Sequence, residues 1–141
     1  RSGARAVIIF EGTNDLTMGI KATEIYAGII SLVERAHTAG LCVVLGTIMP
    51  RDDLNNGWDR ATMEPERTAL NALLRATKNI EGLADFDQVM GSPADPTYPN
   101  PLLYIPDLLH PNTLGFQVMA DALPLKAITP PPFGRCARQS R

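Results

Sequence analysis

The stretch Ala6-Val7-Ile8-Ile9-Phe10 decides the fold, and the polar stretch Glu11-Gly12-Thr13-Asn14-Asp15 follows it at once. A continuous apolar run rich in β-branched residues is typical of a strand that is buried on both faces of a parallel sheet. Glycine, asparagine and aspartate are common in the turn that follows such a strand. We therefore predict a buried strand over 6–10 whose carboxyl end leads directly to Asn14.

Strands and helices alternate along the rest of the chain. Apolar residues at helical spacing predict a helix from Lys21 to Ala39, with Gly40 placed to end it. The other predicted elements are a second buried strand over 41–48, a helix with Pro65 in its first turn, a short third strand over 82–86 and a last helix capped by Asn112. This alternation predicts an α/β fold with parallel strands and right-handed crossovers.

Two polar motifs are expected at one edge of that sheet, because ligands bind outside the carboxyl ends of parallel strands. Asn14 follows the first strand, and Asp107-Leu108-Leu109-His110 lies in the long loop after the third. An asparagine amide can donate to an oxyanion at any working pH. A carboxylate three residues before a histidine can reach one imidazole nitrogen and orient the ring. The combination suits ester hydrolysis, with Asn14 as oxyanion donor, His110 as general base and Asp107 as its orienting partner.

Each motif also has an ordinary interpretation when it is taken alone. Gly12-Thr13-Asn14-Asp15 has the composition of any turn after a strand. His110-Pro111-Asn112 could be a loop in which Asn112 only caps the next helix. The order of the two motifs and their place after strands favour the catalytic interpretation. The sequence between the motifs favours it too, because that sequence is similar to a known family of hydrolases.

The sequence around these motifs resembles the SGNH, or GDSL-type, hydrolase family over residues 4–125, and is similar to its secreted bacterial or fungal members. The resemblance implies a flavodoxin-like three-layer α/β/α domain that hydrolyses carboxylic esters through an acyl-serine intermediate. It maps the asparagine of the family onto Asn14, the histidine onto His110 and its aspartate onto Asp107. The similar segments are 5–15, 39–47, 85–87, 92–96, 110–116 and 120–123.

The nucleophile of that family has no counterpart here. No Gly-Asp-Ser turn occurs in the sequence, and the glycine block that supplies a backbone oxyanion donor is also absent. The four serines, Ser2, Ser31, Ser92 and Ser140, lie at the termini, in a predicted helix or in a proline-rich loop, so none is predicted to replace it. We therefore expect a fragment of a serine esterase that is inactive alone. Two alternatives remain open: a non-catalytic binding or interaction module that kept the fold, and a half-enzyme that obtains its serine from a separate chain.

A fragment of this kind has consequences for the sheet and the termini. Residues 1–125 are expected to be the C-terminal part of the domain, truncated at the N-terminus with about three parallel strands retained. By the strand order of the family, the strand over 6–10 would lie at an open edge, through which the chain could self-associate. Residues 126–141, which are rich in proline and arginine, are expected to be a disordered tail.

Two loops are predicted to shape the substrate cleft. The loop 50–60 follows the second strand and contains Trp58, although it could also be an ordinary solvated loop. The loop 88–106 contains Tyr98, Tyr104 and several prolines, and loops of this length are usually functional or disordered. Trp58, Tyr98 and Tyr104 are therefore the candidate residues for the lips of the cleft.

Composition restricts the partners. With 141 residues, a net charge of −2 and 45% hydrophobic residues, the chain is expected to form one domain that binds neither nucleic acid nor a membrane surface. No apolar run is long enough to span a membrane. Two histidines and two cysteines are too few for a predicted metal site, and we expect no cofactor. Cys42 is predicted to be a small core residue rather than half of a disulfide with Cys136 in the tail.

Overall fold

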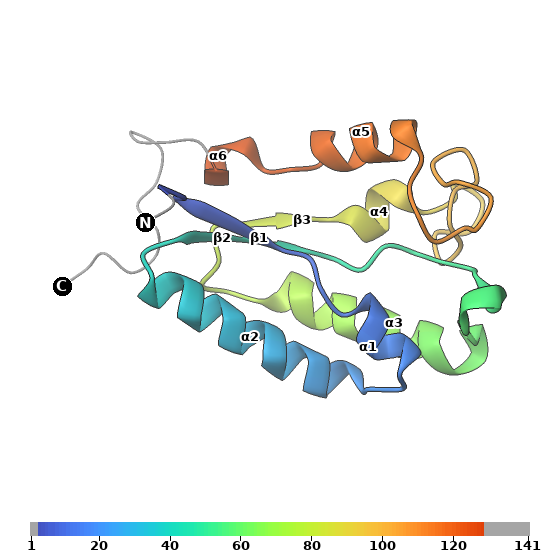
Figure 1. Cartoon of the computed structure of the whole chain (residues 1–141), viewed down its shortest axis with the longest axis horizontal. Coiled ribbons are helices and arrows are strands. Elements are labelled where there is room, and N and C mark those ends of the chain that lie inside the picture. The colour runs from blue at the N-terminus through green and yellow to red at the C-terminus, as the bar shows by residue number, and fades with distance from the viewer. Residues whose placement is uncertain (1–2, 129–141) are drawn as a thin grey trace.

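The computed structural model describes residues 3–128, and its centre is a sheet of three parallel strands (Figure 1). The strands are β1 (Ala6–Ile9), β2 (Cys42–Gly46) and β3 (Gly82–Ala84), in the order β1-β2-β3. Ala6 lies opposite Cys42, and Val44 lies opposite Gly82. The prediction of three parallel strands joined by helical crossovers is therefore confirmed.

Helices cover both faces of this sheet and make three layers. In Figure 1, α2 (Ala22–Thr38) and α3 (Arg60–Ala76) lie on one side, together with the short α1 (Thr13–Thr17). On the other side lie α5 (Thr113–Asp121) and α6 (Leu125–Ile128). The short α4 (Phe86–Met90) continues from the carboxyl end of β3 and contacts α5. A single 3-10 turn, Leu54–Asn56, precedes α3.

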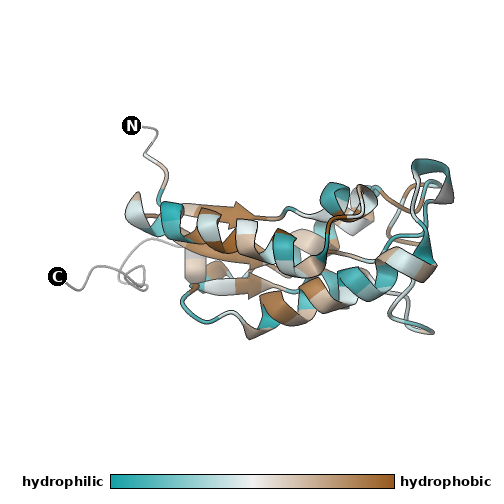
Figure 2. Ribbon diagram, turned by 90° about the horizontal axis from the view of Figure 1, so that it is seen from below, coloured by the Kyte–Doolittle hydropathy of each residue, from teal (hydrophilic) through white to brown (hydrophobic). Residues whose placement is uncertain are grey.

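Alternation of side chains along the strands divides the core in two. Val43 and Leu45 of β2 face the layer of α2 and α3, where they pack with Ile29 and Leu70. Val44, between them in sequence, faces the other layer and packs with Phe86. The strands are accordingly among the most apolar elements of the ribbon (Figure 2).

Most element boundaries follow the local signals. Helix α2 ends at Thr38, and Gly40 has a φ of +78° and donates its N–H to the carbonyl of His37. The start of α3 is different, because Asp59 caps the helix by accepting from the N–H of Ala61 at 3.1 Å. Pro65 therefore lies inside the helix on its exposed side, and the prediction that Pro65 belongs to the first turn was wrong.

The edge strand β1 is less buried than predicted. Ile8 is 43% exposed, and Ala6 and Val7 are only partly buried. The reason is that β1 pairs with β2 on one side only among the described residues, while α6 packs over β2. The prediction of burial on both faces was therefore wrong for Ile8, although its place at an open edge agrees with the expected strand order.

The last described residues also correct the sequence prediction. Residues 126–128, expected to begin a disordered tail, belong to α6, and Ala127 packs against the cluster around Val44. Residues 129–141 lie outside the described part of the chain.

Cys42 is disulfide-bonded, so its prediction as an ordinary core residue was wrong. The packing of α6 on β2 brings the C-terminal part of the described chain beside the strand that carries Cys42. Within residues 3–128, none of the helices has the length and apolar character needed to cross a membrane.

Candidate active site

A tight turn after β1 delivers Asn14. Gly12 has a φ of +121°, a conformation that favours glycine, and a Cβ there would lie 3.0 Å from Cγ2 of Ile25. The chain then enters α1, so that Asn14 lies in the first turn of a short helix rather than on an open loop. Its carbonyl accepts from the N–H of Met18 at 3.0 Å, and the residue is exposed. The backbone of Asn14 is therefore fixed while its amide remains accessible.

The segment from Asp107 to His110 forms a compact turn that joins the two side chains. His110 Nδ1 lies 2.6 Å from Asp107 Oδ2. The other oxygen, Oδ1, accepts from the N–H groups of Leu109 and His110, each at 2.9 Å. The His110 side chain and these two N–H groups lower the pKa of Asp107 to about 2. An ionised Asp107 assigns the donor N–H to Nδ1 and leaves Nε2, which bonds to none of the described residues, as the acceptor.

The start of α5 holds this turn in place. Asn112 caps the helix by accepting from the N–H of Gly115 at 3.0 Å, and its amide donates to the carbonyls of Leu102 and Tyr104. Gly115 allows close contact, because a Cβ there would lie 2.0 Å from the carbonyl oxygen of Leu103. Asn112 therefore acts as the predicted cap and also anchors the loop that carries the Asp107–His110 turn.

Asn14 and His110 line the same cavity, which has a volume of about 310 Å³. Most of the other lining side chains are apolar, including Phe10, Ile48, Met49, Phe116 and Met119. Ligand sites commonly combine an apolar wall with a few convergent polar groups. The cavity thus offers an amide donor and an imidazole acceptor beside an apolar surface, an arrangement that suits an ester with a hydrocarbon part.

The predicted lip residues are placed elsewhere. Trp58 and Tyr104 are buried, at 0% and 4% exposure, so their prediction as lips was wrong. Trp58 packs in the core with Arg51 over its ring, and Tyr104 Oη donates to the carbonyl of Pro50. Tyr98 is exposed, but it packs on the guanidinium of Arg60 and does not line the cavity. Met49 and Phe116 occupy the wall where these aromatic residues were expected.

The sequence prediction also missed a charged residue of the site. Arg51 lines the cavity, is buried, and forms an ion pair with Asp53. Its Nη1 also donates to Thr13 Oγ1 at 2.9 Å, directly beside Asn14. The available signal was the sequence Pro50-Arg51-Asp52-Asp53, which places an arginine and two carboxylates immediately after a buried strand.

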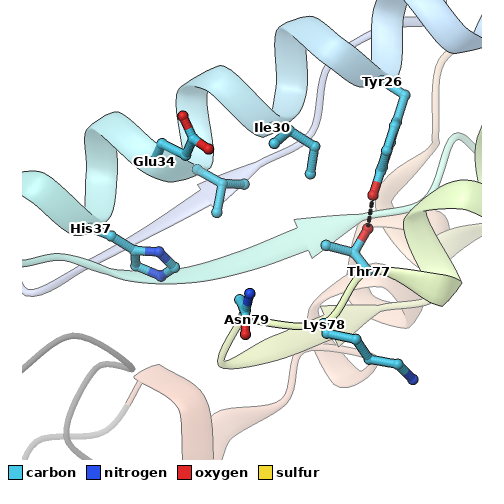
Figure 3. Close-up of a pocket in the computed structure, with 8 residues that line it drawn as sticks. Tyr26, Ile30, Glu34, His37, Thr77, Lys78 and Asn79 are labelled. Atoms are coloured by element: carbon cyan, nitrogen blue, oxygen red, sulfur yellow. Dashed lines mark hydrogen bonds between the residues drawn. The ribbon is translucent and has the colours of Figure 1, made fainter.

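A second cavity lies between α2 and the loop that leads from α3 to β3 (Figure 3). It has a volume of about 300 Å³, and Tyr26, Glu34, His37 and Asn79 are among its lining residues. Tyr26 Oη and Thr77 Oγ1 are 3.1 Å apart across it, and the buried His37 is paired with Glu81 at 3.2 Å. None of the residues of the predicted site lines this cavity. No cluster of three or more potential metal ligands occurs in the described part of the chain.

Comparison with known proteins identifies the family of the chain. The model of the GDSL-like lipase/acylhydrolase family matches residues 1–118, so the chain belongs to that family. The structure is similar to that of a GDSL-like lipase from Bacteroides thetaiotaomicron (24% identity, TM-score 0.70) and to that of a putative acylhydrolase from Bacteroides fragilis (27% identity, TM-score 0.70). Each similarity covers 83% of this chain and 58% of the other, so the chain spans less than two thirds of the length of either protein. The search of curated proteins gave no match.

Proposed function

We propose that this chain supplies the oxyanion donor and the histidine–aspartate pair of a carboxylic ester hydrolase, and that a serine from another segment, in cis or in trans, completes the site. The observation that carries the proposal is that Asn14 and His110 line one cavity while Asp107 bonds His110 Nδ1. A small-molecule ester is the substrate class that this chemistry suits.

The chemistry follows from the free nitrogen of His110. Nε2 takes the proton of the serine hydroxyl as its oxygen attacks the ester carbonyl, and the Asn14 amide donates to the oxyanion that forms. The imidazolium, stabilised by the Asp107 carboxylate, then returns the proton to the leaving alcohol. Water attacks the acyl-serine by the same route and releases the acid.

The two serines among the described residues do not meet the geometric requirement for a nucleophile. Ser31 is exposed in the middle of α2, and Ser92 follows α4; neither lines the cavity of Asn14 and His110. Ser2 and Ser140 lie outside the described residues. We therefore propose that the chain alone does not hydrolyse esters above background, and that the complete enzyme has a nucleophile that this chain does not contain.

The test is complementation. The reading frame upstream of Arg1 is sequenced, and any Gly-Asp-Ser segment that it encodes is added in cis or in trans before hydrolysis of a short-chain nitrophenyl ester is measured. Restored activity should fall by about 10²–10³ for Asn14→Ala, which is the usual effect of one oxyanion donor. His110→Ala should lose more, and Asp107→Ala should lose less than His110→Ala, because Asp107 orients the base rather than transferring the proton.

Three results would contradict the proposal. Activity of the isolated chain that a serine-directed phosphonate abolishes would show that one of its own serines is the nucleophile. A restored enzyme that tolerates His110→Ala would show that His110 is not the base. A start codon shortly before Arg1, with no serine segment encoded upstream or in a separate gene, would favour the non-catalytic module. A separate gene for that segment would instead support the half-enzyme, in which the serine is supplied in trans.

We also propose that the isolated chain self-associates through β1. The support is that β1 has an unpaired edge within the described residues and that Ile8 exposes 43% of its surface there. Ile8→Lys should convert an associated chain to a monomer in size-exclusion chromatography with light scattering. Met18→Lys makes the same change of charge at a residue that is 78% exposed and outside the strand, and it should leave the association unchanged. A monomeric wild-type chain would contradict the proposal.

A further inference from the structure

The segment 50–53, which follows β2, contacts both halves of the candidate active site. On one side, Arg51 Nη1 donates to Thr13 Oγ1 at 2.9 Å and to Thr17 Oγ1 at 3.3 Å, and both threonines belong to α1. Thr13 immediately precedes Asn14. The guanidinium of Arg51 thus holds the first turn of the helix that carries the oxyanion donor.

On the other side, the same segment bonds to the loop of His110. The N–H of Asp52 donates to the carbonyl of Leu108 at 3.2 Å, and the carbonyl of Pro50 accepts from Tyr104 Oη at 2.7 Å. Leu108 lies within the turn between Asp107 and His110. Residues 50–53 therefore connect the turn that carries His110 with α1, the helix that carries Asn14.

We propose that Arg51 is a positioning residue, which holds α1 so that the Asn14 amide faces the reaction centre beside His110. This proposal rests on the esterase function proposed above. Arg51 acts through Thr13 and the backbone of α1, and not by contact with the substrate.

The hydrogen bonds of Arg51 distinguish positioning from direct catalysis. Nε and Nη2 donate to the two carboxylate oxygens of Asp53, and Nη1 is occupied by the threonines. All three nitrogens are thus engaged, and the ion pair with Asp53 offsets the charge of the guanidinium. The guanidinium carbon lies over the ring of Trp58, 4.8 Å from the ring centroid. Arg51 is therefore held from several sides although it lines the cavity.

Stability alone does not account for this arrangement. A buried ion pair often contributes little to folding, because the desolvation of two charges offsets their attraction. The planar guanidinium can bond a carboxylate through two nitrogens and still donate from the third, which an ammonium group cannot reproduce. An arginine is therefore the residue type that can fix Asp53 and α1 at the same time.

The chain offers a matched control in Arg67. This arginine is equally buried and paired with Glu64 and Asp87, and its Nη1 donates to the carbonyl of Ile48. Arg67 bonds to neither α1 nor the Asp107–His110 turn. Arg67→Lys thus disturbs a comparable buried ion pair without removing a hydrogen bond to α1 or to the Asp107–His110 turn.

The first experiment uses the chain itself and measures hydrogen exchange of the Met18 amide, which bonds to the Asn14 carbonyl. Arg51→Lys and Thr13→Val should each accelerate this exchange by about tenfold or more, relative to amides of the core strands. Thr13→Ser keeps the hydroxyl and should restore the wild-type rate, and Arg67→Lys should not change the rate relative to the core. Unchanged exchange in both folded variants would overturn the proposal; if Arg51→Lys does not fold, Thr13→Val decides.

The second experiment uses the complemented enzyme. Arg51→Lys should lower kcat by about 10–100-fold with little change of KM, because the hydrogen bonds that it removes position the oxyanion donor. Arg67→Lys should lower kcat less than Arg51→Lys does, because Arg67 makes no hydrogen bond to α1. Suppose that Arg51→Lys and Thr13→Val accelerate exchange of the Met18 amide but that no complemented enzyme is active. The proposed esterase function is then wrong, whereas the conclusion that Arg51 fixes α1 is supported. Equal losses of kcat for Arg51→Lys and Arg67→Lys would overturn the positioning role.

Discussion

Tyr104 and Pro50 lie 54 positions apart in the chain, and the Tyr104 hydroxyl donates a 2.7 Å hydrogen bond to the Pro50 carbonyl. Burial raises the pKa of the Tyr104 hydroxyl, which therefore remains a donor throughout the neutral range. This bond fastens the loop that precedes His110 to the segment that follows β2. A tyrosine expected at the mouth of the cleft is instead part of the support beneath it.

Tyr104→Phe should lower the free energy of unfolding by about 0.5–1.5 kcal/mol, because it removes one buried hydrogen bond and keeps the packed ring. Urea denaturation measures the change. Tyr98→Phe is the matched control, since the Tyr98 hydroxyl bonds to none of the described residues and the ring keeps its contact with Arg60. Equal destabilisation by the two variants would show that the bond to Pro50 contributes nothing.

Gly115→Ala should destabilise the fold by about 1–3 kcal/mol, the usual cost of overpacking. The added Cβ would lie 2.0 Å from the Leu103 carbonyl oxygen and would push α5 away from the loop of His110. Gly28→Ala, in the middle of α2, meets nothing within 4 Å and should stabilise by about 0.5–1 kcal/mol through helix propensity. Thermal or urea unfolding of the two variants should therefore give changes of opposite sign, and the same sign for both would contradict the close contact at Gly115.

The local sequence predicted the secondary structure better than it predicted the contacts between distant segments. The apolar run from Ala6, the glycine after α2 and the cap at Asn112 are local signals, and they predicted the strands and most helices. Asn14 and His110 were predictable as a pair because parallel strands place their carboxyl ends at one edge. Their meeting in one cavity follows from that topology.

The contacts that support the site were not predictable in the same way. Trp58 and Tyr104 occur among polar and proline residues, which is typical of exposed loops, yet both are buried. Their burial depends on bonds and packing between distant segments, such as Arg51 with Thr13 and Tyr104 with Pro50. Hydrophobic periodicity carries no information about such pairs. Pro65 was misplaced for a related reason, because Asp59 starts the helix six residues earlier.

Asn112→Asp should separate the two functions of Asn112. The carboxylate still accepts from the N–H of Gly115, but it cannot donate to the carbonyls of Leu102 and Tyr104. We expect a loss of about 1–3 kcal/mol in the free energy of unfolding, since two acceptors lose their donor and face a negative charge. Asp59→Asn is the converse change at the cap of α3, where the side chain only accepts hydrogen bonds. This variant should change the free energy of unfolding by no more than about 0.5 kcal/mol. If Asn112→Asp leaves the free energy of unfolding unchanged, the loop does not depend on the Asn112 amide.

The Asp107 carboxyl should titrate with a pKa of about 2, and His110→Ala should raise that pKa, because the bond to His110 is its largest cause. Two backbone N–H donors remain in the variant, so the pKa should stay below the ordinary value of 3.8. The folded pKa is depressed, and the contribution of this carboxylate to stability is therefore complete above the unfolded pKa and is lost as the pH falls through about 2. Carbon NMR of the side-chain carboxyl measures the midpoint in both proteins. Asp95, whose pKa is lowered by Thr97 and not by a histidine, should titrate identically in the two. An unchanged Asp107 midpoint in His110→Ala would show that the pair seen in the structure does not form in solution, and the assignment of His110 as an oriented base would lose its support.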